Sequence, residues 1–475
     1  MQIPKQGLSR EEVLSALQQY KARDMDWKAG RVWAYVYDPG DDVADTIKQA
    51  YTMFLTENAL DPTVFPSLLK LETDVVRMVA NLLSGDAKVV GHATSGGTES
   101  ILLVVKTARD YARVEKPHIH TPEIVLPQTA HASFHKAAHY FGLKTVVTPF
   151  DPLTFRADVA AMREAITENT ILLVGSAPCY SQGVVDPIPE IGALAQEKGL
   201  LFHVDSCVGG IHLSFMRKLG YHVPEFDFSV PGVTSMSADL HKYGYAAKGA
   251  SVVLYRDKSL RRYQIYASTD TTAYTLINPT ILSSKSGGPL AGAWAILHYL
   301  GEDGYLRIVK EVQEATRQLV EGIQAIPALR VLGNPDMCMF SFASDEINVY
   351  QLADEMKKFG WYLQGQFSTP HSPRNLHVSV NHGTAAQVKD FLKDLRLCVE
   401  AVRQSPPLDS DFIRAAVAAL LENPSREAMG SLWAMAGIQG SELPDEMAFI
   451  NEFLDAMPDE YANLLLIEYF NDLYV

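Results

Sequence analysis

Short apolar runs alternate with helical stretches along the chain from about residue 67 onward. The runs are EIVLP, KTVVTP, TILLVGSAP and LLFHVD, which begin at Glu123, Lys144, Thr170 and Leu200. Between them, apolar positions repeat with the period of a helix, for example over residues 157–166 and 187–198. Strands that are apolar on both faces and alternate with helices are typical of a largely parallel sheet covered on both sides. We therefore predict an α/β fold whose ligand lies beyond the carboxyl ends of the strands.

The pattern changes twice after this α/β region. A helical stretch over residues 289–326 is followed by three short strand candidates, LRVLG, CMFSFA and NLHVSV, with helices such as 349–359 between and after them. This arrangement predicts a small α+β domain. Beyond Pro406 and Pro407 the sequence becomes helix-rich and acidic, and the amphipathic segments DFIRAAVAALLEN and EMAFINEFLDAM predict a helical C-terminal extension.

The N-terminal region shows a capping signal followed by irregular sequence. Ser9 and Glu12 form the capping-box pattern Ser-x-x-Glu, which predicts a first helix that runs toward Tyr20. Between Trp27 and Pro66, turn formers interrupt any long apolar period, so we predict an irregular arm. The predicted organisation is an N-terminal arm at 1–66, a large cofactor-binding domain at 67–327, a small α+β domain at 328–405 and a helical extension at 406–475.

Composition and charge narrow the class of partner. The 475 residues are 47% hydrophobic and carry a formal net charge of -15. Nucleic-acid binding needs clustered Lys and Arg, which we do not find, so we expect a small-molecule partner and no nucleic acid. The four cysteines are far apart and form no CxxC pair, which argues against a zinc knuckle or a disulfide framework. The N-terminus has no apolar signal-peptide core and no window of about 20 apolar residues is present, so we expect a cytoplasmic protein without a transmembrane segment.

The segments HVDSCVGG and SADLHKYGYAAKG carry the most specific chemical signal. They place Asp205 at the end of a buried strand and Lys242 further along the chain. An enzyme that uses pyridoxal 5'-phosphate (PLP) needs a lysine within reach of the cofactor's aldehyde, and a carboxylate that keeps the pyridine nitrogen protonated. Asp205 and Lys242 suit these two roles. The sequence therefore predicts an enzyme that holds PLP as a Schiff base on Lys242.

Two further features suit the phosphate of that cofactor. His241 directly precedes Lys242 and can donate a hydrogen bond to the phosphate, although a His-Lys dipeptide on its own is also typical of a protein surface. In ATSGGTES, Gly97 and Thr98 stand at the start of a strongly periodic helix. Backbone N–H groups at a helix start bind anions, and glycine lets the backbone approach closely. The alternative for Gly96 and Gly97 is an ordinary tight turn.

Three histidines in HASFHKAAH recur every four residues, at 131, 135 and 139. On a helix they would share one face and suggest a metal site, but no carboxylate or cysteine shares that face, so we predict no metal. We interpret His131 as a ring that stacks on a planar cofactor, and His135 and His139 as packing or surface residues. His203 and Cys207, in the segment HVDSC, are interpreted as buried core residues.

These motifs resemble those of the group II PLP-dependent decarboxylases and, within that family, the sphingosine-1-phosphate lyases. The cofactor motifs TSGGTES, HVD and HKYG mark the wider family, whereas LPQTAHASF, GVVDPIPEI, KYGYAAKGAS and NALDPTVFPSLLKLE resemble the lyases in particular. The similarity covers roughly residues 30–400. It implies a PLP type I fold with a mostly parallel seven-stranded sheet, a homodimer with shared active sites, and cleavage of phosphorylated sphingoid bases into a long-chain aldehyde and phosphoethanolamine.

The resemblance also implies roles for individual residues. It implies that His131 stacks on the cofactor ring and that Asp205 pairs with the ring nitrogen. The residues implied to bind the cofactor phosphate are Gly97, Thr98 and His241, with Ser286 and Gly287 reaching in from the second subunit. Those implied for the substrate phosphate are Tyr37, Asn58, Tyr180 and Lys248. Tyr180 and Lys248 are also the candidates for proton handling, because a second lysine can assist proton transfer without competing for the aldehyde.

One position departs from the lyase pattern. The pattern Asn-Pro-Leu-His-Pro reads Asn-Ala-Leu-Asp-Pro over residues 58–62, so Asp61 stands where a histidine would meet the substrate phosphate. An anionic carboxylate repels a phosphate. Either Asp61 points away from the substrate or the preferred substrate has a different head group.

The expected reaction is a retro-aldol cleavage, in which the 3-hydroxyl loses its proton, the C2–C3 bond breaks and the electrons flow into the cofactor ring. Two alternatives stay open. An amino-acid decarboxylase on the same fold would break the bond to the α-carboxylate, and the motifs at Asn58 and Lys248 disfavour it. A non-catalytic PLP-binding paralogue is disfavoured by the intact Asp205, His241 and Lys242.

Overall fold

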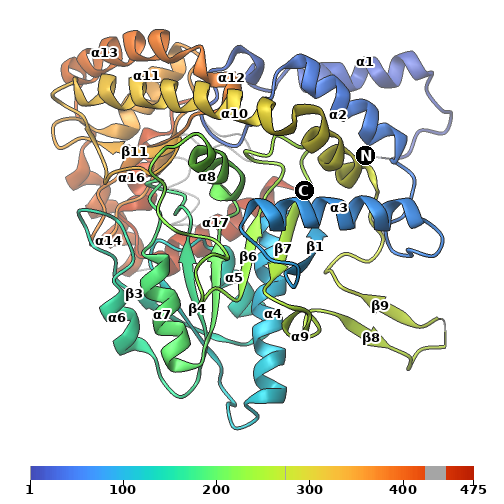
Figure 1. Cartoon of the computed structure of the whole chain (residues 1–475). Helices are drawn as coiled ribbons and strands as arrows, with labels where there is room; N and C mark the ends of the chain where they lie inside the picture. The colour runs from blue at the N-terminus through green and yellow to red at the C-terminus, as the bar shows by residue number, and fades with distance from the viewer. Residues whose placement is uncertain (1, 273, 423–444, 475) are drawn as a thin grey trace.

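The computed structural model describes residues 2–272, 274–422 and 445–474, and a seven-stranded sheet forms its centre (Figure 1). The strand order is β1-β7-β6-β5-β4-β2-β3. The strands are β1 Val90–Thr94, β2 Glu123–Pro127, β3 Lys144–Thr148, β4 Thr170–Ser176, β5 Leu201–Asp205, β6 Ser235–Ala238 and β7 Ser251–Tyr255. Strands β2 to β6 pair in parallel, and β7 is antiparallel to both of its neighbours, β6 and β1. The predicted mostly parallel sheet is confirmed.

The central strands are buried on both faces because two layers of helices cover the sheet. In β2, Ile124 and Leu126 pack into a core with α4 and α5, whereas Val125 between them packs into the core on the opposite face. Helices α3, α6, α7 and α8 cover that second face. The helices of the two layers are α3 Pro66–Leu82, α4 Gly97–Glu115, α5 Ser133–Phe141, α6 Val159–Ala165, α7 Ile188–Lys198 and α8 Gly209–Lys218.

A long helix leads from the large sheet to a smaller one. Helix α10, Gly288–Gln324, is kinked at Gly301 and packs against α2, α3 and α8. The small sheet is antiparallel, in the order β10-β11-β13-β12. Its strands are β10 Arg330–Val331, β11 Met339–Ala343, β12 Gln364–Gln366 and β13 Asn375–Ser379, and the nearby helices are α11 Val349–Lys358, α12 His382–Ala385 and α13 Val388–Gln404. The pattern of apolar residues predicts β10, β11 and β13, but not β12.

The N-terminal arm lies against the small sheet. Helix α1, Arg10–Lys21, begins at the predicted capping box. After the short helix η1, Trp27–Ala29, the backbone N–H of Trp33 donates to the carbonyl of Tyr362 at 3.1 Å. The carbonyl of Trp33 accepts a hydrogen bond from the N–H of Ser379 at 2.9 Å, and its side chain is fully buried. The arm is thereby fixed to the region around β12 and β13.

The irregular arm predicted up to residue 66 contains a helix, α2 Asp41–Met53, so that part of the prediction is wrong. Val43 and Ile47 lie one helical turn apart on its buried face, and the helix packs along α10. Gly40, which reads as part of a chain-breaking turn, is the N-cap residue of this helix. The turn formers therefore mark a helix start, not an absence of helix.

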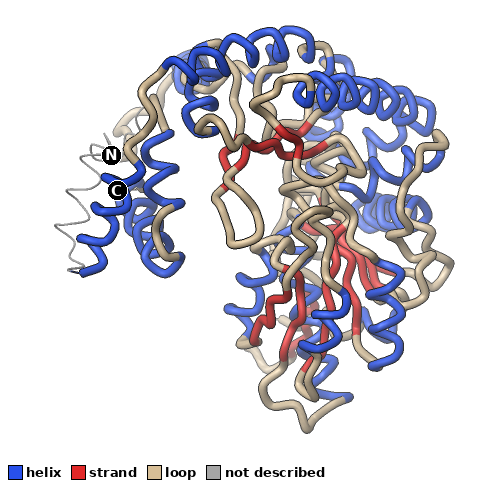
Figure 2. Tube along the Cα trace, turned by 90° about the vertical axis from the view of Figure 1, so that its left-hand side faces the viewer, coloured by secondary structure: helices blue, strands red, loops and turns tan. Residues whose placement is uncertain are grey.

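Two smaller units complete the fold. After helix α9, Lys258–Arg261, the ribbon of β8 Tyr266–Ser268 and β9 Leu276–Asn278 extends away from the large sheet in Figure 1. The C-terminal helices α14 Ser410–Glu422, α16 Ala448–Asp455 and α17 Asp459–Leu473 gather to one side of the molecule in Figure 2 around a core of their own. The predicted helical extension is confirmed. No helix in the described ranges has the length and apolarity needed to cross a membrane.

Candidate active site

A cavity of about 360 Å³ lies at the carboxyl ends of β4, β5 and β6, beside the start of α4. An α/β sheet binds its ligands at this edge. The polar side chains and glycines around the cavity include Gly97, Thr98, His131, Tyr180, Asp205, Asp239, His241 and Lys242. The fold therefore brings together residues that are up to 145 positions apart, from Gly97 to Lys242. Asp239 is the member of this group that sequence reasoning missed, although it stands three positions before Lys242 in SADLHK.

Lys242 and His241 both face the carboxylate of Asp239. Lys242 Nζ lies 3.0 Å from Asp239 Oδ2, and His241 Nε2 lies 3.5 Å from the same oxygen. Burial lowers the pKa of Lys242, but the negative charge of Asp239 and smaller contributions outweigh burial, so the net pKa of Lys242 is raised. The protein without cofactor therefore holds Lys242 as an ammonium group.

The ring of His241 is oriented by the backbone. The N–H of Ala250 donates to His241 Nδ1 at 3.2 Å, so the proton of the neutral ring sits on Nε2. The ring also lies next to the start of α4, because a Cβ on Gly96 would approach His241 Cε1 to 3.4 Å. The His241 ring thus borders the helix start, with the proton on Nε2, which lies 3.5 Å from Asp239 Oδ2.

The start of α4 leaves room for a ligand but not for side chains. Gly96 is the N-cap residue and makes no side-chain hydrogen bond, so the first N–H groups of the helix face the cavity without a capping side chain. A Cβ on Gly97 would lie 2.8 Å from both Asp239 Oδ2 and Cys207 Sγ. Only glycine fits at this position, because Asp239 and Cys207 pack against it. The backbone N–H groups of the helix start are the part of this region that suits a phosphate.

A chain of hydroxyl groups links the helix start to His131. Thr98 Oγ1 lies 3.1 Å from Ser133 Oγ, which lies 2.9 Å from His131 Nδ1. The N–H of Ser133 also donates to His131 Nδ1 at 3.2 Å. These contacts fix the orientation of the His131 ring at the cavity wall.

Asp205 ends β5 inside the cavity and is largely buried. Its Oδ1 accepts a hydrogen bond from the N–H of Cys207 at 3.0 Å and from the hydroxyl of Ser237 at 3.4 Å. Among the described residues, both of these bonds reach Oδ1, which leaves Oδ2 to meet a ligand. A carboxylate fixed in this way suits a protonated ring nitrogen.

These groups fit the polar parts of PLP. The N–H groups of the helix start and the His241 donor suit its phosphate, the Lys242 amine suits its aldehyde, and the Asp205 carboxylate suits its pyridine nitrogen. The aldehyde and the ring nitrogen of PLP lie opposite each other on its ring, and the matching groups come from different places, Asp205 from the end of β5 and Lys242 from the turn after β6.

Lys248 lies next to this cavity, between the large sheet and the arm. Its Nζ donates to the carbonyl of Tyr35 at 3.0 Å and lies 4.8 Å from the centre of the Tyr37 ring. Tyr35 has a φ of 63°, a left-handed conformation that is uncommon for a residue with a large side chain. Burial, followed by the positive charge of Lys242, lowers the pKa of Lys248 to about 8. Lys248 is thus a cation that readily loses its proton.

Tyr180 is held by the small sheet. Its hydroxyl donates to Gln364 Oε1 at 2.7 Å, and its ring stacks on His377 with a centroid distance of 4.2 Å. Burial raises the pKa of Tyr180, so the hydroxyl keeps its proton at neutral pH. Sequence reasoning missed Gln364 and His377, because they lie in strands of another sheet and belong to no recognisable motif.

The structure places Asn58, Ser286 and Gly287 together, outside the lining of the Lys242 cavity. Asn58 and Ser286 form an isolated antiparallel bridge, and Asn58 Oδ1 accepts a hydrogen bond from the N–H of Lys285 at 3.3 Å. The N–H of Gly287 donates to the carbonyl of Glu57 at 3.0 Å. The three residues therefore lie together in one part of the chain and do not line the Lys242 cavity of the same chain.

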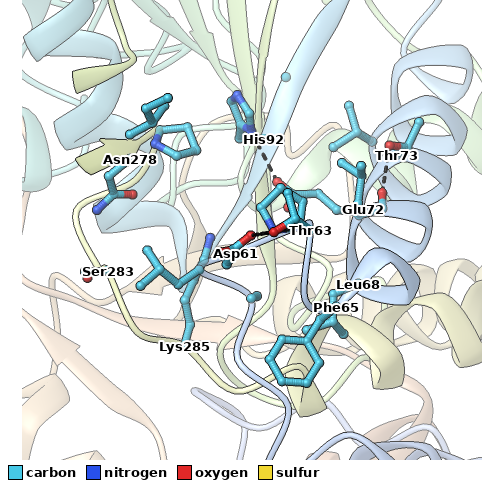
Figure 3. Close-up of a pocket in the computed structure, with 18 of the residues that line it drawn as sticks. Asp61, Thr63, Phe65, Leu68, Glu72, Thr73, His92, Asn278, Ser283 and Lys285 are labelled. Carbon is cyan, nitrogen blue, oxygen red and sulfur yellow. Dashed lines mark hydrogen bonds and ion pairs between the residues drawn. The ribbon is translucent and has the colours of Figure 1, made fainter. Parts of the chain in front are cut away.

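Asp61 lies in a second, larger cavity of about 590 Å³, which Figure 3 shows together with Lys285. Its carboxylate accepts hydrogen bonds from the N–H and hydroxyl of Thr63, at 2.8 and 2.6 Å. These hydrogen bonds lower the pKa of Asp61, so the group is anionic at neutral pH. The carboxylate is turned into its own loop and does not line the Lys242 cavity.

The remaining candidates behave as core residues. His203 is fully buried, its ring nitrogens contact the hydroxyls of Ser235 and Ser237 at 3.0 and 3.2 Å, and burial lowers its pKa to about 4. Burial raises the pKa of the Cys207 thiol, which makes a nucleophilic thiolate unfavourable. Within the described part of the chain, no three His, Cys, Asp or Glu side chains are arranged to hold a metal ion.

The chain is similar to known proteins over most of its length, not only in the residues around the cavity. Residues 22–344 match the family described as "Pyridoxal-dependent decarboxylase conserved domain", and residues 411–472 match "Pyridoxal-dependent enzyme, C-terminal putative HTH domain". A sphingosine-1-phosphate lyase from Arabidopsis thaliana is 42% identical over 412 residues, which are 85% of this chain and 74% of that protein.

Two further relatives mark the range of the similarity. The solved structure of a sphingosine-1-phosphate lyase from Burkholderia pseudomallei is 37% identical, covers 90% of this chain and 98% of that chain, and has a TM-score of 0.81. An L-aspartate/L-glutamate decarboxylase from Pyrococcus horikoshii is 32% identical over 83% of this chain and 99% of that protein. The fold, the cavity that fits PLP and these matches agree. The chain belongs to the group II PLP-dependent decarboxylase family and, within it, to the sphingosine-1-phosphate lyases.

Proposed function

We propose that this enzyme cleaves the C2–C3 bond of sphingosine 1-phosphate and releases a long-chain aldehyde and phosphoethanolamine. The observation that carries this proposal is the Lys248 ammonium, which lies over the Tyr37 ring beside the Lys242 cavity. It is a second cation, in addition to Lys242, and it can anchor a substrate phosphate. The similarity to sphingosine-1-phosphate lyases over most of the chain supports the same substrate class.

The cavity residues take separate roles in holding the cofactor. Gly97, Thr98 and His241 bind its phosphate, His131 stacks on its ring, and Asp205 pairs with the ring nitrogen. Lys242 carries its aldehyde carbon. PLP supplies an electron sink that accepts the electron pair of the breaking carbon–carbon bond.

Tyr180 and Lys248 are the proposed proton carriers. The Tyr180 hydroxyl, held by Gln364, can exchange a proton with the 3-hydroxyl of the substrate. The Lys248 ammonium anchors the substrate phosphate and can deliver a proton to an anion that develops nearby. Tyr37, whose ring lies under the ammonium, completes this part of the site.

The proposal includes a homodimer in the cytoplasm. The exposed side chains of the β8–β9 ribbon include Tyr266, Tyr274 and Ile277, which are 56%, 63% and 61% exposed. An apolar surface of this kind is typical of a protein interface. Ser286 and Gly287 lie close after this ribbon in sequence and serve the cofactor phosphate of the second subunit. Asn58, which is bridged to Ser286, serves the second subunit's substrate as well.

In this proposal Asp61 does not oppose the substrate phosphate. Its carboxylate is held by Thr63 within its own loop and faces the cavity that also contains Lys285. Of the two explanations for the missing histidine, this geometry supports the one in which the acid points away.

The proposal is tested by incubating the purified protein with sphingosine 1-phosphate and measuring both phosphoethanolamine and the long-chain aldehyde. We expect both products in equal amounts from the wild type and none from Lys242→Ala. If the wild type shows the absorbance of bound PLP but forms neither product, the proposed reaction is wrong. Release of carbon dioxide from free amino acids would then identify a decarboxylase.

A further inference from the structure

Asp239 is a buried carboxylate that the proposed reaction leaves without a role. Its side chain is 1% exposed, and its Oδ2 faces both Lys242 Nζ and His241 Nε2. Burial raises the pKa of Asp239, but the positive charges of Lys242 and His241 and a hydrogen bond from Ser251 outweigh burial, so the net pKa is lowered and the group is an anion. A buried carboxylate is costly unless a positive charge or hydrogen bonds compensate it. Its position next to the lysine that holds the cofactor indicates that this charge acts on the Lys242 nitrogen.

Backbone hydrogen bonds hold Asp239 and Lys242 in one turn. The N–H of Asp239 donates to the carbonyl of Cys207 at 3.1 Å, which ties it to the segment after β5. The N–H of Lys242 donates to the carbonyl of Asp239 at 3.4 Å, so both residues belong to one tight turn after β6. The turn therefore keeps the two residues close together, and the buried Asp239 carboxylate lies 3.0 Å from Lys242 Nζ.

We propose that Asp239 is a positioning residue that acts as the counter-ion of the Lys242 nitrogen, both when the lysine is joined to PLP and when the substrate has displaced it. The inference rests on the proposed function only in that Lys242 carries PLP. In the joined state, Asp239 favours the protonated form of the linking nitrogen, which is the form that an incoming amine attacks.

In the displaced state, Asp239 holds the released amine. The substrate arrives as an ammonium and must lose one proton before its nitrogen can take the place of Lys242 on the cofactor carbon. The substrate nitrogen gives up a second proton as it becomes joined to the cofactor carbon. Lys242, whose nitrogen carries one hydrogen in the joined state, leaves with its bonding pair and takes up two protons, so the exchange is balanced in atoms and charge. The resulting ammonium lies 3.0 Å from the Asp239 carboxylate and cannot attack the cofactor again until it loses that proton.

The test is a pH titration of the cofactor absorbance in the holoenzyme, which reports the protonation of the nitrogen that joins Lys242 to PLP. For Asp239→Asn we expect the midpoint to fall by at least about one pH unit, because a nearby negative charge of this kind shifts a titration by one unit or more. A midpoint unchanged within about 0.3 units, with PLP bound, would overturn the proposal.

Asp205→Asn is the matched control, since it removes the same charge from the same cavity. It also removes the proton from the ring nitrogen, so its midpoint is expected to stay or rise, not to fall. If Asp239→Asn fails to fold or to hold PLP, a second measurement uses the wild-type protein freed of cofactor and follows its rate of PLP binding as a function of pH. Its rate of PLP capture should still rise with pH at about pH 9, and a rate that levels off below about pH 8 would overturn the proposal.

Neither titration depends on cleavage of a substrate. A protein that binds PLP and shows the shifted midpoint but does not cleave sphingosine 1-phosphate would refute the proposed function and leave the role of Asp239 intact.

Discussion

Lys248 is the side chain on which recognition of the substrate phosphate depends in our proposal. Its pKa of about 8 means that the amine is charged at neutral pH and becomes neutral in mildly alkaline solution. A neutral amine does not attract a phosphate, so the group works on the acidic side of its pKa. The contribution of Lys248 to substrate binding is therefore present below about pH 8 and lost above it.

We expect kcat/KM for sphingosine 1-phosphate to fall as the pH rises through about 8, mainly through KM. Lys248→Arg should move this fall to higher pH, because a guanidinium keeps its charge. Lys248→Met should lower kcat/KM roughly 10- to 100-fold at neutral pH, as a hydrogen bond to a charged group contributes about 1.5–3 kcal/mol. Steady-state profiles of the three proteins check this, and an Arg variant with an unmoved profile would contradict it.

The residues that sequence alone could predict are those in contiguous motifs with one evident chemical purpose. Lys242 and Asp205 are examples, since Asp205 ends a buried strand and Lys242 lies in the motif HKYG, and the structure places both in one cavity. Asp239 stands in the same segment, but a carboxylate near a lysine in sequence is usually an ordinary surface ion pair, and its burial is known only from the structure. Gln364 and His377 contact Tyr180 because the small sheet packs near the large one. A contact between two sheets cannot be predicted from a local sequence pattern.

Whole helices and strands were predictable where their burial leaves a clear pattern of apolar residues in the sequence. The central strands are apolar on both faces because helices cover both, so the sequence shows them as unbroken runs. Strand β12 has the sequence QGQ and is only partly buried, so it carries no such signal, and pairing with β13 alone makes it a strand. Helix α2 was missed because its N-cap glycine follows a proline, a combination that also ends helices.

One arginine contributes to the docking of the C-terminal helices. Arg374, next to β13, contacts Glu452 and lies 3.5 Å from Asp455, two acids of α16 whose side chains are 4% and 2% exposed. Asp354 of α11 accepts hydrogen bonds from the first N–H groups of α16, at Met447 and Ala448. The tail is therefore attached to the small sheet by buried polar groups as well as by its own core.

Arg374→Met should loosen this attachment, because it leaves two buried carboxylates without the guanidinium. We expect the free energy that holds the C-terminal helices to the small sheet to fall by about 3 kcal/mol. This is the lower end of the range for breaking a buried ion pair, because a third of the Arg374 side chain is exposed. Hydrogen exchange of residues 448–473 should become faster while the large sheet is unaffected. Arg414→Met, which removes an exposed pair with Asp411, is the control and should change little. Equal exchange in the two variants would contradict the prediction.

At the scale of the whole molecule, the predicted site residues fall into two groups in one subunit, one that lines the Lys242 cavity and one that does not. Ser286 and Gly287 are fixed to the segment around Asn58, not to the Lys242 cavity. A single subunit therefore presents a cofactor cavity that lacks one part of the predicted phosphate site. The missing part is supplied in our proposal by a second copy.

We expect the protein to be a dimer whose dissociation releases PLP. Sedimentation at decreasing protein concentration should show the mass falling from two chains to one, and the absorbance of bound PLP should be lost over the same range. The physical reason is that a monomer lacks the donors that Ser286 and Gly287 contribute to the cofactor phosphate. A monomer that keeps its PLP at the same affinity would refute the shared site.

The arm that crosses between the sheets couples head-group selectivity to residues far from the reacting atoms. Tyr35 presents its carbonyl to Lys248, and two residues earlier Trp33 is clamped by the backbone of Tyr362 and Ser379. The Lys248 ammonium is thus positioned by two carbonyls, that of Tyr35 on the arm fixed to the small sheet and that of His241 at 3.3 Å. Substitutions in the arm around Trp33 and Tyr35 can therefore shift the Lys248 ammonium and change which phosphorylated amine such an enzyme accepts, while the side chains that line the cofactor cavity stay the same.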